Sequence, residues 1–245
     1  MTAPLPRRLL AEYLGSLLLA ALVIGSGIAA ASLSDDVGLQ LLENAAATAA
    51  GLFAIILVLG PVSGAHLNPV VSLVDAAFGG LRWRDAAAYV PVQIAGCASG
   101  AVLANGMFGL AAVSISETHR ATGPHLLAEV VATTGLLLVI FSLVRSGRAA
   151  IAPAAVGAYI GAAYWFTSST SFANPAITTG RTLSDTFAGI APSSAPSYVA
   201  AQLVGGAIAV GLIRALYPGI APADASDVVV PHDPRRLPHP TTPAS

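Results

Sequence analysis

Two short stretches decide how this chain folds: Ser63–Val70, which reads SGAHLNPV, and Ser171–Ala176, which reads SFANPA. Asparagine is a favoured N-cap residue, and proline fits the first turn of a helix because its missing N–H would have no partner there. We therefore expect a short helix to begin at each proline. Neither helix is long enough to cross a bilayer, which takes about 20 residues. The two expected helices run through Val70–Ala77 and Ala176–Thr182.

Long apolar windows surround these two stretches. Of the 245 residues, 55% are hydrophobic and 9% are charged, whereas a soluble domain carries about 25% charged residues. So few charges cannot cover a water-exposed surface, which excludes a soluble globular protein. The sequence predicts an all-α membrane protein with six transmembrane helices and two re-entrant half-helices. The six windows are Leu9–Ala31, Asn44–Val62, Ala86–Gly109, Leu126–Val144, Ala149–Thr167 and Tyr198–Tyr217.

The order of features is repeated along the chain. A glutamate opens the first and the fourth windows, at Glu12 and Glu129, and a Gln-x-x-Gly sequence follows each Asn-Pro pair, at Gln93 and Gln202. Three spans per repeat is an odd number, so the two halves must be inverted relative to each other. Inverted repeats place a shared site near the bilayer midplane, on discontinuous helices.

The arginines predict the orientation. With the N-terminus in the cytoplasm, only Arg120 and Arg181 fall outside, and an excess of basic residues on the cytoplasmic side is the known bias. Both termini are then cytoplasmic, in the inner or plasma membrane. The arginines that fall inside are Arg7, Arg8, Arg82, Arg84, Arg145, Arg148, Arg214, Arg235 and Arg236.

The chain is predicted to form one membrane domain, residues 1–217, with its repeats over about 7–110 and 125–217. The proline-rich segment 218–245 cannot bury a core, so we predict a disordered cytoplasmic tail. The net charge of −1 and the lack of a dense basic run argue against nucleic acid as a partner. The single cysteine, Cys97, excludes an internal disulfide and a cysteine metal site. We expect no metal or other cofactor.

Glu12 and Glu129 need a role, because carboxylates within membrane spans are costly. One role is proton carriage in a coupled transporter, and the other is to accept hydrogen bonds from the backbone of the re-entrant loops. Their symmetric placement without a buried basic partner favours the structural role. His66 is interpreted as a hydrogen-bonding support of its loop, with gating as the alternative.

With both Asn-Pro boxes, both glutamates and both Gln-x-x-Gly segments, residues 7–217 resemble an aquaporin of the major intrinsic protein family. The resemblance implies six tilted helices, two half-helices that meet at mid-membrane, a pore in each protomer and a homotetramer. It also implies that Asn68 and Asn174 point amide N–H groups into the pore. The first Asn-Pro box of this chain ends in valine, whereas the family usually has alanine at that position. The residues that form the pore ends of the half-helices are Asn68, Pro69, Val70, Asn174, Pro175 and Ala176.

The resemblance also locates a selectivity filter. A typical aquaporin has an arginine directly after its second Asn-Pro-Ala, and here that position is Ile177. Counting without gaps from the Asn-Pro pairs puts the other filter positions at Thr48, Ala162 and Ser171. These residues predict a wide, uncharged filter, which argues against a strict water channel. The aromatic wedge that faces the arginine in a glycerol facilitator is missing, and the nearby Tyr164, Trp165 and Phe166 offer a partial replacement for it. The interpretation favoured here is that they are packing or interfacial residues.

Arg181 follows Ile177 by four residues, hence by one turn on the same helical face. We predict that it lines the outer vestibule and supplies part of the missing positive charge. The alternative is that it caps the C-terminal end of the half-helix, where a cation is favoured. The segment Ile177–Asp185 (ITTGRTLSD) resembles bacterial aquaglyceroporins associated with arsenic resistance.

The predicted function is a passive channel for water and small uncharged solutes, either glycerol-like molecules or metalloids such as arsenous acid. The half-helix N-termini would repel cations, because each carries about half a positive charge. The alternative is a proton-coupled secondary transporter of a small neutral solute, which also uses inverted repeats. An enzyme is not expected, because the serines near His66 lack a nucleophile–base pairing on separate spans.

Overall fold

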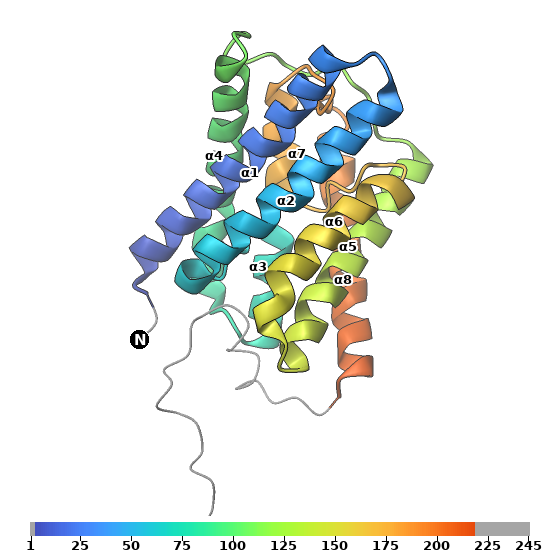
Figure 1. Cartoon of the computed structure of the whole chain (residues 1–245). Helices are drawn as coiled ribbons and strands as arrows, with labels where there is room; N and C mark the ends of the chain where they lie inside the picture. The colour runs from blue at the N-terminus through green and yellow to red at the C-terminus, as the bar shows by residue number, and fades with distance from the viewer. Residues whose placement is uncertain (1–2, 219–245) are drawn as a thin grey trace, which may run out of the picture.

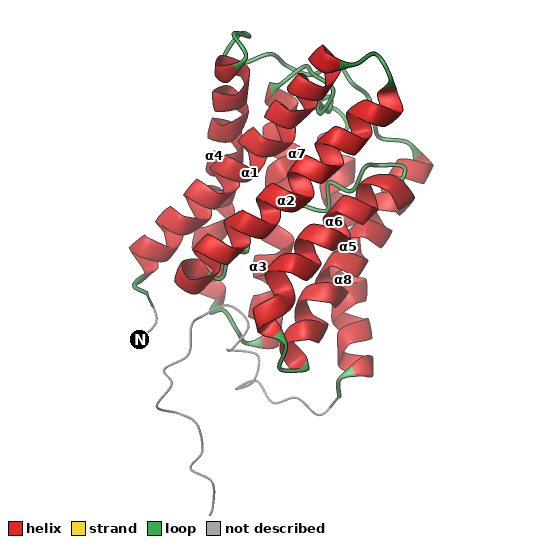
Figure 2. Ribbon diagram, in the orientation of Figure 1, coloured by secondary structure: helices red, strands yellow, loops and turns green. Residues whose placement is uncertain are grey.

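The structure of the chain is a computed structural model that describes residues 3–218. Every regular element between residues 3 and 218 is a helix, and no strand occurs there (Figure 2). The all-helical fold expected from the sequence is therefore confirmed. The predicted disordered tail, 218–245, lies outside the described residues except for its first residue.

Six long helices form the body of the molecule. Each is long and apolar enough to cross a membrane, the fifth of them together with a short 3-10 turn, η1 (Ala149–Ile151). Their ends lie within a few residues of the predicted windows, apart from the start of the second. The six are α1 (Leu5–Leu33), α2 (Val37–Ser63), α4 (Trp83–Met107), α5 (Gly123–Arg145), α6 (Ala152–Phe166) and α8 (Ala195–Leu216).

The start of α2 differs most from the prediction. The helix begins at Val37 rather than at Asn44, because Asp36 is its N-cap and accepts a hydrogen bond of 3.1 Å from the backbone N–H of Leu39. An aspartate at this position stabilises the first turn by satisfying a backbone donor that has no partner within the helix. The apolar window alone did not include this polar turn.

Two short helices begin at the Asn-Pro pairs, as predicted. They are α3 (Pro69–Phe78) and α7 (Pro175–Gly180), and α7 continues as one 3-10 turn, η2 (Arg181–Leu183). The α-helical part of α7 ends early where the chain passes close to α4. A Cβ atom on Gly180 would lie 2.7 Å from the backbone oxygen of Cys97.

The asparagines cap both short helices in the same way. The side-chain oxygen of Asn68 accepts from the N–H of Val70 at 2.9 Å, and that of Asn174 accepts from the N–H of Ala176 at 2.9 Å. Each proline occupies the first turn. Local sequence alone therefore explains where these helices start, because cap and proline both act within two residues.

The two halves of the chain pack alike (Figure 1). Helix α1 contacts α2 and α4, and α5 contacts α6 and α8, while α3 and α7 contact each other in the interior. In Figure 1, α3 lies in the lower half of the bundle and α7 in the upper half. We call the end that holds Leu5 and Leu216 the tail side, and the opposite end, which holds Leu33 and Phe166, the loop side.

The glycines of the Gln-x-x-Gly segments allow the closest helix contacts. A Cβ atom on Gly96 of α4 would lie 2.4 Å from the backbone oxygen of Tyr13 in α1. A Cβ atom on Gly205 of α8 would lie 2.7 Å from the backbone oxygen of Val130 in α5. Backbones that approach this closely are typical of helix packing in lipid, where small residues line the interface.

The outside of the bundle is apolar. Large hydrophobic side chains on the long helices are exposed, and a continuous surface of this kind suits lipid rather than water. Charged groups occur mainly near the helix ends. Examples of the exposed apolar residues are Leu10, Val58, Leu127, Trp165 and Leu216.

Candidate functional site

A cavity of about 310 Å³ extends through the interior of the bundle. Its lining includes Gly60 and Pro153 toward the tail side, and Tyr164 and Arg181 toward the loop side. The half-helices meet between these ends, so the cavity passes the site that the repeat predicts. No aspartate or glutamate lines it among residues 3–218.

Asn68 and Asn174 exchange hydrogen bonds across the middle of the cavity. The side-chain amide of Asn68 donates to the backbone oxygen of Ala173 at 2.7 Å, and that of Asn174 donates to the backbone oxygen of Leu67 at 2.7 Å. An asparagine amide has two N–H donors, and both asparagines line the cavity. One N–H of each therefore ties the two loops together, and the other has no acceptor among the described residues.

Glu12 holds the first loop from α1. Its carboxylate accepts from the hydroxyl of Ser63 at 2.6 Å, the backbone N–H groups of His66 and Leu67 at 2.9 and 2.7 Å, and the side-chain amide of Gln93 at 2.8 Å. Four donors occupy both oxygens of a carboxylate that is fully buried. This is the geometry of a structural acceptor rather than of a group in contact with a passing solute.

Glu129 holds the second loop from α5 in the same manner. It accepts from the backbone N–H groups of Phe172 and Ala173, both at 2.9 Å, and from the side-chain amide of Gln202 at 2.6 Å. It too is fully buried. The glutamine of each Gln-x-x-Gly segment therefore bridges a glutamate to the half-helix, a role that sequence reasoning did not assign.

Both loops contain residues with positive φ. Ala65 and Leu67 have φ of 46° and 51°, and the residues at the same offsets from the second asparagine, Ser171 and Ala173, have φ of 52° and 48°. The left-handed region is costly for residues other than glycine. The carboxylate hydrogen bonds of the two glutamates offset this cost, which gives the buried carboxylates a physical purpose.

His66 lines the cavity and supports its loop. Its Nδ1 atom lies 2.9 Å from the hydroxyl of Ser72, and its Nε2 atom lies 3.6 Å from Oδ2 of Asp75. Asp75 is fully buried in α3, and its oxygens have no hydrogen-bond partner among the described residues. Sequence reasoning missed Asp75, although an acidic residue inside the apolar stretch Val70–Ala77 was a signal.

Three of the four predicted filter residues line the cavity: Thr48, Ser171 and Ile177. The fourth, Ala162, does not. It is exposed, and α6 faces the cavity with Ile160 and Tyr164 instead. The cavity-facing residue of α6 lies two positions nearer to the second Asn-Pro pair than an ungapped count assumes, so the prediction for Ala162 is wrong.

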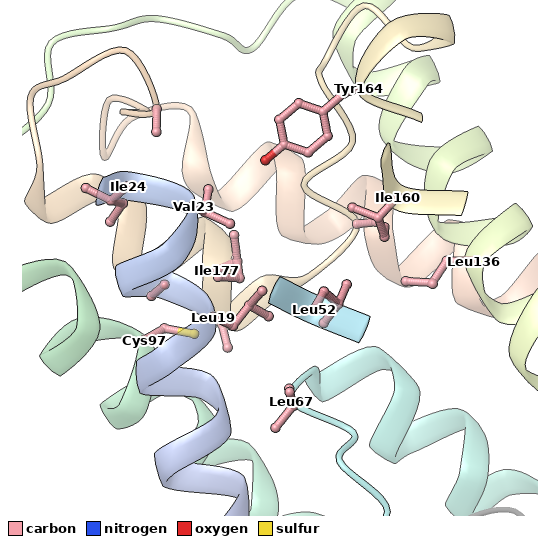
Figure 3. Packing of buried hydrophobic residues seen from close by; sticks show 14 of the residues in the cluster. Leu19, Val23, Ile24, Leu52, Leu67, Cys97, Leu136, Ile160, Tyr164 and Ile177 are labelled. Atoms are coloured by element: carbon pink, nitrogen blue, oxygen red, sulfur yellow. The ribbon is translucent and has the colours of Figure 1, made fainter. Parts of the chain in front are cut away.

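Tyr164 therefore lines the cavity and does not serve helix packing alone. Its hydroxyl lies 3.2 Å from that of Thr48 on α2. Figure 3 shows its ring reaching into the interior, where Ile160 and Ile177 also point. The neighbouring aromatics Trp165 and Phe166 are exposed, as expected of interfacial side chains. The lining at this level therefore includes an aromatic ring that the predicted set of filter residues did not contain.

Arg181 lines the same cavity, one turn beyond Ile177. Its guanidinium carbon lies 3.4 Å from the ring centre of Phe172, and its Nε donates to the backbone oxygen of Ala188. Within residues 3–218 its side chain makes no hydrogen bond to a backbone oxygen of α7. Arg181 is thus a cavity-lining residue whose side chain is held by Ala188, and its role in an outer vestibule stays a prediction.

No metal centre competes with this arrangement in the described part of the chain. Between residues 3 and 218, no group of three or more histidine, cysteine, aspartate and glutamate side chains lies close enough to hold an ion. Cys97 is a free, buried thiol. The polar side chains that line the cavity are two amides, three hydroxyls, one imidazole and one guanidinium, from Asn68, Asn174, Thr48, Tyr164, Ser171, His66 and Arg181.

Comparison with known proteins gives the same picture. The family model described as Major intrinsic protein matches residues 1–171. Aquaglyceroporin AqpS of Rhizobium meliloti (strain 1021) is 49% identical over 211 residues, which cover 86% of this chain and 90% of that protein. The Glycerol uptake facilitator protein of Pseudomonas aeruginosa is 30% identical over 178 residues, 62% of this chain and 63% of that protein.

A solved structure shares the fold. The X-ray structure of the aquaglyceroporin from Plasmodium falciparum superposes with a TM-score of 0.67 at 20% sequence identity, covering 86% of this chain and 96% of that one. At this identity the likeness shows the fold alone.

Proposed function

The chain belongs to the major intrinsic protein family and is a passive channel for water and glycerol-like small solutes, and we propose that it also admits uncharged metalloid acids such as arsenous acid. The observation that carries the proposal is Ile177, an apolar residue where the family places an arginine. An apolar side chain there removes a charge and leaves room for a compact molecule larger than water. Arsenous acid is neutral near pH 7 and has hydroxyl groups, as glycerol has.

The proposed conduction path passes between the two asparagines. The free N–H of Asn68 and that of Asn174 would bind the oxygen of a solute at mid-membrane. Each half-helix begins there and adds a partial positive charge. Cations and protons are repelled at this point, whereas neutral molecules with acceptor oxygens are not. Selectivity between neutral solutes would be set nearer the loop side, by Thr48, Tyr164 and Ile177.

The protein is a multi-pass integral membrane protein of a family of channels rather than enzymes. We further propose that the tail side faces the cytoplasm, that the membrane is the cell membrane, and that the protein forms a homotetramer in lipid. The arginine distribution supports the orientation. The resemblance to aquaporins supports the tetramer.

Stopped-flow light scattering on proteoliposomes tests the proposal. We expect water, glycerol and arsenous acid to cross faster than in protein-free vesicles, with no increase in proton leak. Ile177→Arg should reduce the glycerol and arsenous acid rates far more than the water rate. A wild-type protein that conducts water and glycerol but excludes arsenous acid would contradict the metalloid part of the proposal.

A proton-coupled transporter remains the second candidate, because His66 lines the cavity and its Nε2 atom lies 3.6 Å from Oδ2 of Asp75. Such a pair offers the titratable group that coupling needs. A coupled transporter would show saturable flux and would accumulate solute when a pH gradient is imposed. A channel would show neither.

A further inference from the structure

Two arginines flank one aromatic ring at the loop end of the cavity. The guanidinium carbon of Arg181 lies 3.4 Å from the ring centre of Phe172, and that of Arg120 lies 5.6 Å from it. Arg120 comes from the segment before α5, whereas Arg181 follows α7. Residues far apart in the sequence thus bring two positive charges to one place.

The same two arginines bind three consecutive backbone oxygens. Arg120 donates through Nε to Gly189 at 2.8 Å and through Nη2 to Phe187 at 3.2 Å, and Arg181 donates through Nε to Ala188. These carbonyl dipoles fix both side chains in position. They compensate the positive charges only in part, because a carbonyl oxygen carries a partial charge.

Among residues 3–218, no carboxylate forms an ion pair with either arginine. The ion pairs between residues 3 and 218 involve Arg8, Arg82, Arg84 and His66, and neither Arg120 nor Arg181 takes part in one. Yet Arg181 is only 3% exposed, and burial lowers the pKa of Arg120 from its usual value. Both remain charged at neutral pH, since arginine is not deprotonated in proteins. Buried charges are normally paired, whereas no described carboxylate pairs with these two arginines.

Arg181 lines the cavity and keeps N–H donors that have no acceptor among the described residues. A guanidinium has five N–H donors, and within the described residues only Nε of Arg181 has an acceptor. The other four N–H groups belong to Nη1 and Nη2, and one from each of these nitrogens points along the Nη edge of the guanidinium. That edge matches two oxygens of a planar oxyanion. The residue lines the cavity, so an anion can reach this edge from the conduction path.

We propose that the loop end of the cavity binds one small monovalent carboxylate on the Nη edge of Arg181, and that the bound anion obstructs neutral solutes. Arg120 strengthens the site through its charge without lining the cavity. The inference rests on the proposed channel function, because obstruction presupposes flux. One guanidinium in the lining suits one charge, and the adjacent Ile177 and Val23 accommodate a short alkyl group.

Acetate provides the test, since it is ionised near pH 7, well above a carboxyl pKa of about 4. Proteoliposomes are equilibrated on both sides with sodium acetate, with sodium chloride holding ionic strength constant, and glycerol flux is measured. Wild-type flux should fall to about half at the acetate concentration that half-saturates the site. Each variant is compared with its own acetate-free rate. Arg181→Gln should abolish the inhibition, and Arg120→Gln should weaken it.

Arg181→Lys separates charge from shape, because lysine keeps the charge but lacks the fork. Weaker inhibition than in the wild type is expected for it. Arg145→Gln is the matched control, because it removes an arginine that also packs on an aromatic ring. The guanidinium carbon of Arg145 lies 4.4 Å from the ring centre of Phe78, and Arg145 does not line the cavity. It should respond to acetate as the wild type does.

A second readout is independent of flux. Acetate should raise the melting temperature of the detergent-solubilised wild type relative to chloride, and it should not do so for Arg181→Gln. If the wild type fails to conduct glycerol but is stabilised by acetate, the channel function fails and the anion site stands. Equal inhibition of the wild type and of Arg181→Gln would overturn the proposed anion site. So would the absence of any acetate effect in both assays, and water would then be the solvent of the Arg181 guanidinium.

Discussion

Thr48 and Tyr164 are joined by a hydrogen bond of 3.2 Å between their hydroxyl groups, from α2 and α6, at the loop end of the cavity. The ring of Tyr164 thus has a fixed place beside Ile177, and it fills space that an alanine at this point of the lining would leave open. The loop end of the cavity consequently has an aromatic wall, and position 177 is occupied by an uncharged residue.

Removing that wall should widen the range of solutes. We expect Tyr164→Ala to admit uncharged polyols larger than glycerol, because loss of the ring enlarges the cavity at its loop end. The ratio of xylitol to glycerol permeability in proteoliposomes measures the effect. Trp165→Ala is the control, since Trp165 is the next aromatic but is exposed on the outside of α6. A larger change in the control than in Tyr164→Ala would refute the assignment.

Introducing a positive charge at position 177 should narrow the range of solutes that the channel conducts. Ile177 is 4% exposed and lines the cavity, so a guanidinium there would fill the path and stand one turn from Arg181. We expect glycerol flux to fall by about tenfold, equivalent to about 1.4 kcal/mol in the barrier, with water flux less affected. Ile177→Leu conserves size and polarity and should behave as the wild type. Equal losses of water and glycerol would instead indicate general misfolding or blockage.

Local signals predicted most of the fold. Asn68 and Asn174 begin their helices through contacts within two or three residues, so the sequence alone located both starts. The six spans followed from length and composition. The sequence did not determine which side of α6 faces the cavity. Ala162 and Tyr164 both fit an apolar membrane span, and only the packing of α6 against α2 decides which of them lines the cavity.

The site was harder to predict where it depends on contacts between distant segments. The sequence marked Gln93 and Gln202 as repeated, but their role as bridges to Glu12 and Glu129 needs the geometry of four helices. The pairing of Arg120 with Phe172 also joins separate segments. Composition and spacing carry no information about such long-range partners.

The two glutamates should differ in their contribution to stability. Glu12 accepts four hydrogen bonds and Glu129 accepts three. Glutamine in place of either would remove the charge and turn an N–H group toward other donors. We expect Glu129→Gln to cost about 3 kcal/mol and Glu12→Gln to cost more. Melting temperatures in detergent give the order, with exposed Glu117→Gln as a control. The reverse order would show that the number of donors does not govern stability here.

The valine in the first box has a matching space on α8. A Cβ atom on Gly206 would lie 2.7 Å from Cγ1 of Val70, so the glycine makes room for one of the two methyl groups that distinguish valine from alanine. Gly206→Ala should therefore destabilise the protein by about 1–3 kcal/mol through overpacking, and Val70→Ala by about 2 kcal/mol through the cavity it leaves.

The double variant distinguishes this complementarity from two independent losses. With both changes, the alanine on α8 occupies the space that the valine vacates, so the combined cost should be smaller than the sum by about 1 kcal/mol or more. Gly211→Ala on the same helix is the control, because a Cβ atom there meets nothing within 4 Å. Unfolding in detergent measures the stabilities, and water flux reports whether the half-helix keeps its position. Strict additivity would mean that Val70 and Gly206 do not share this space.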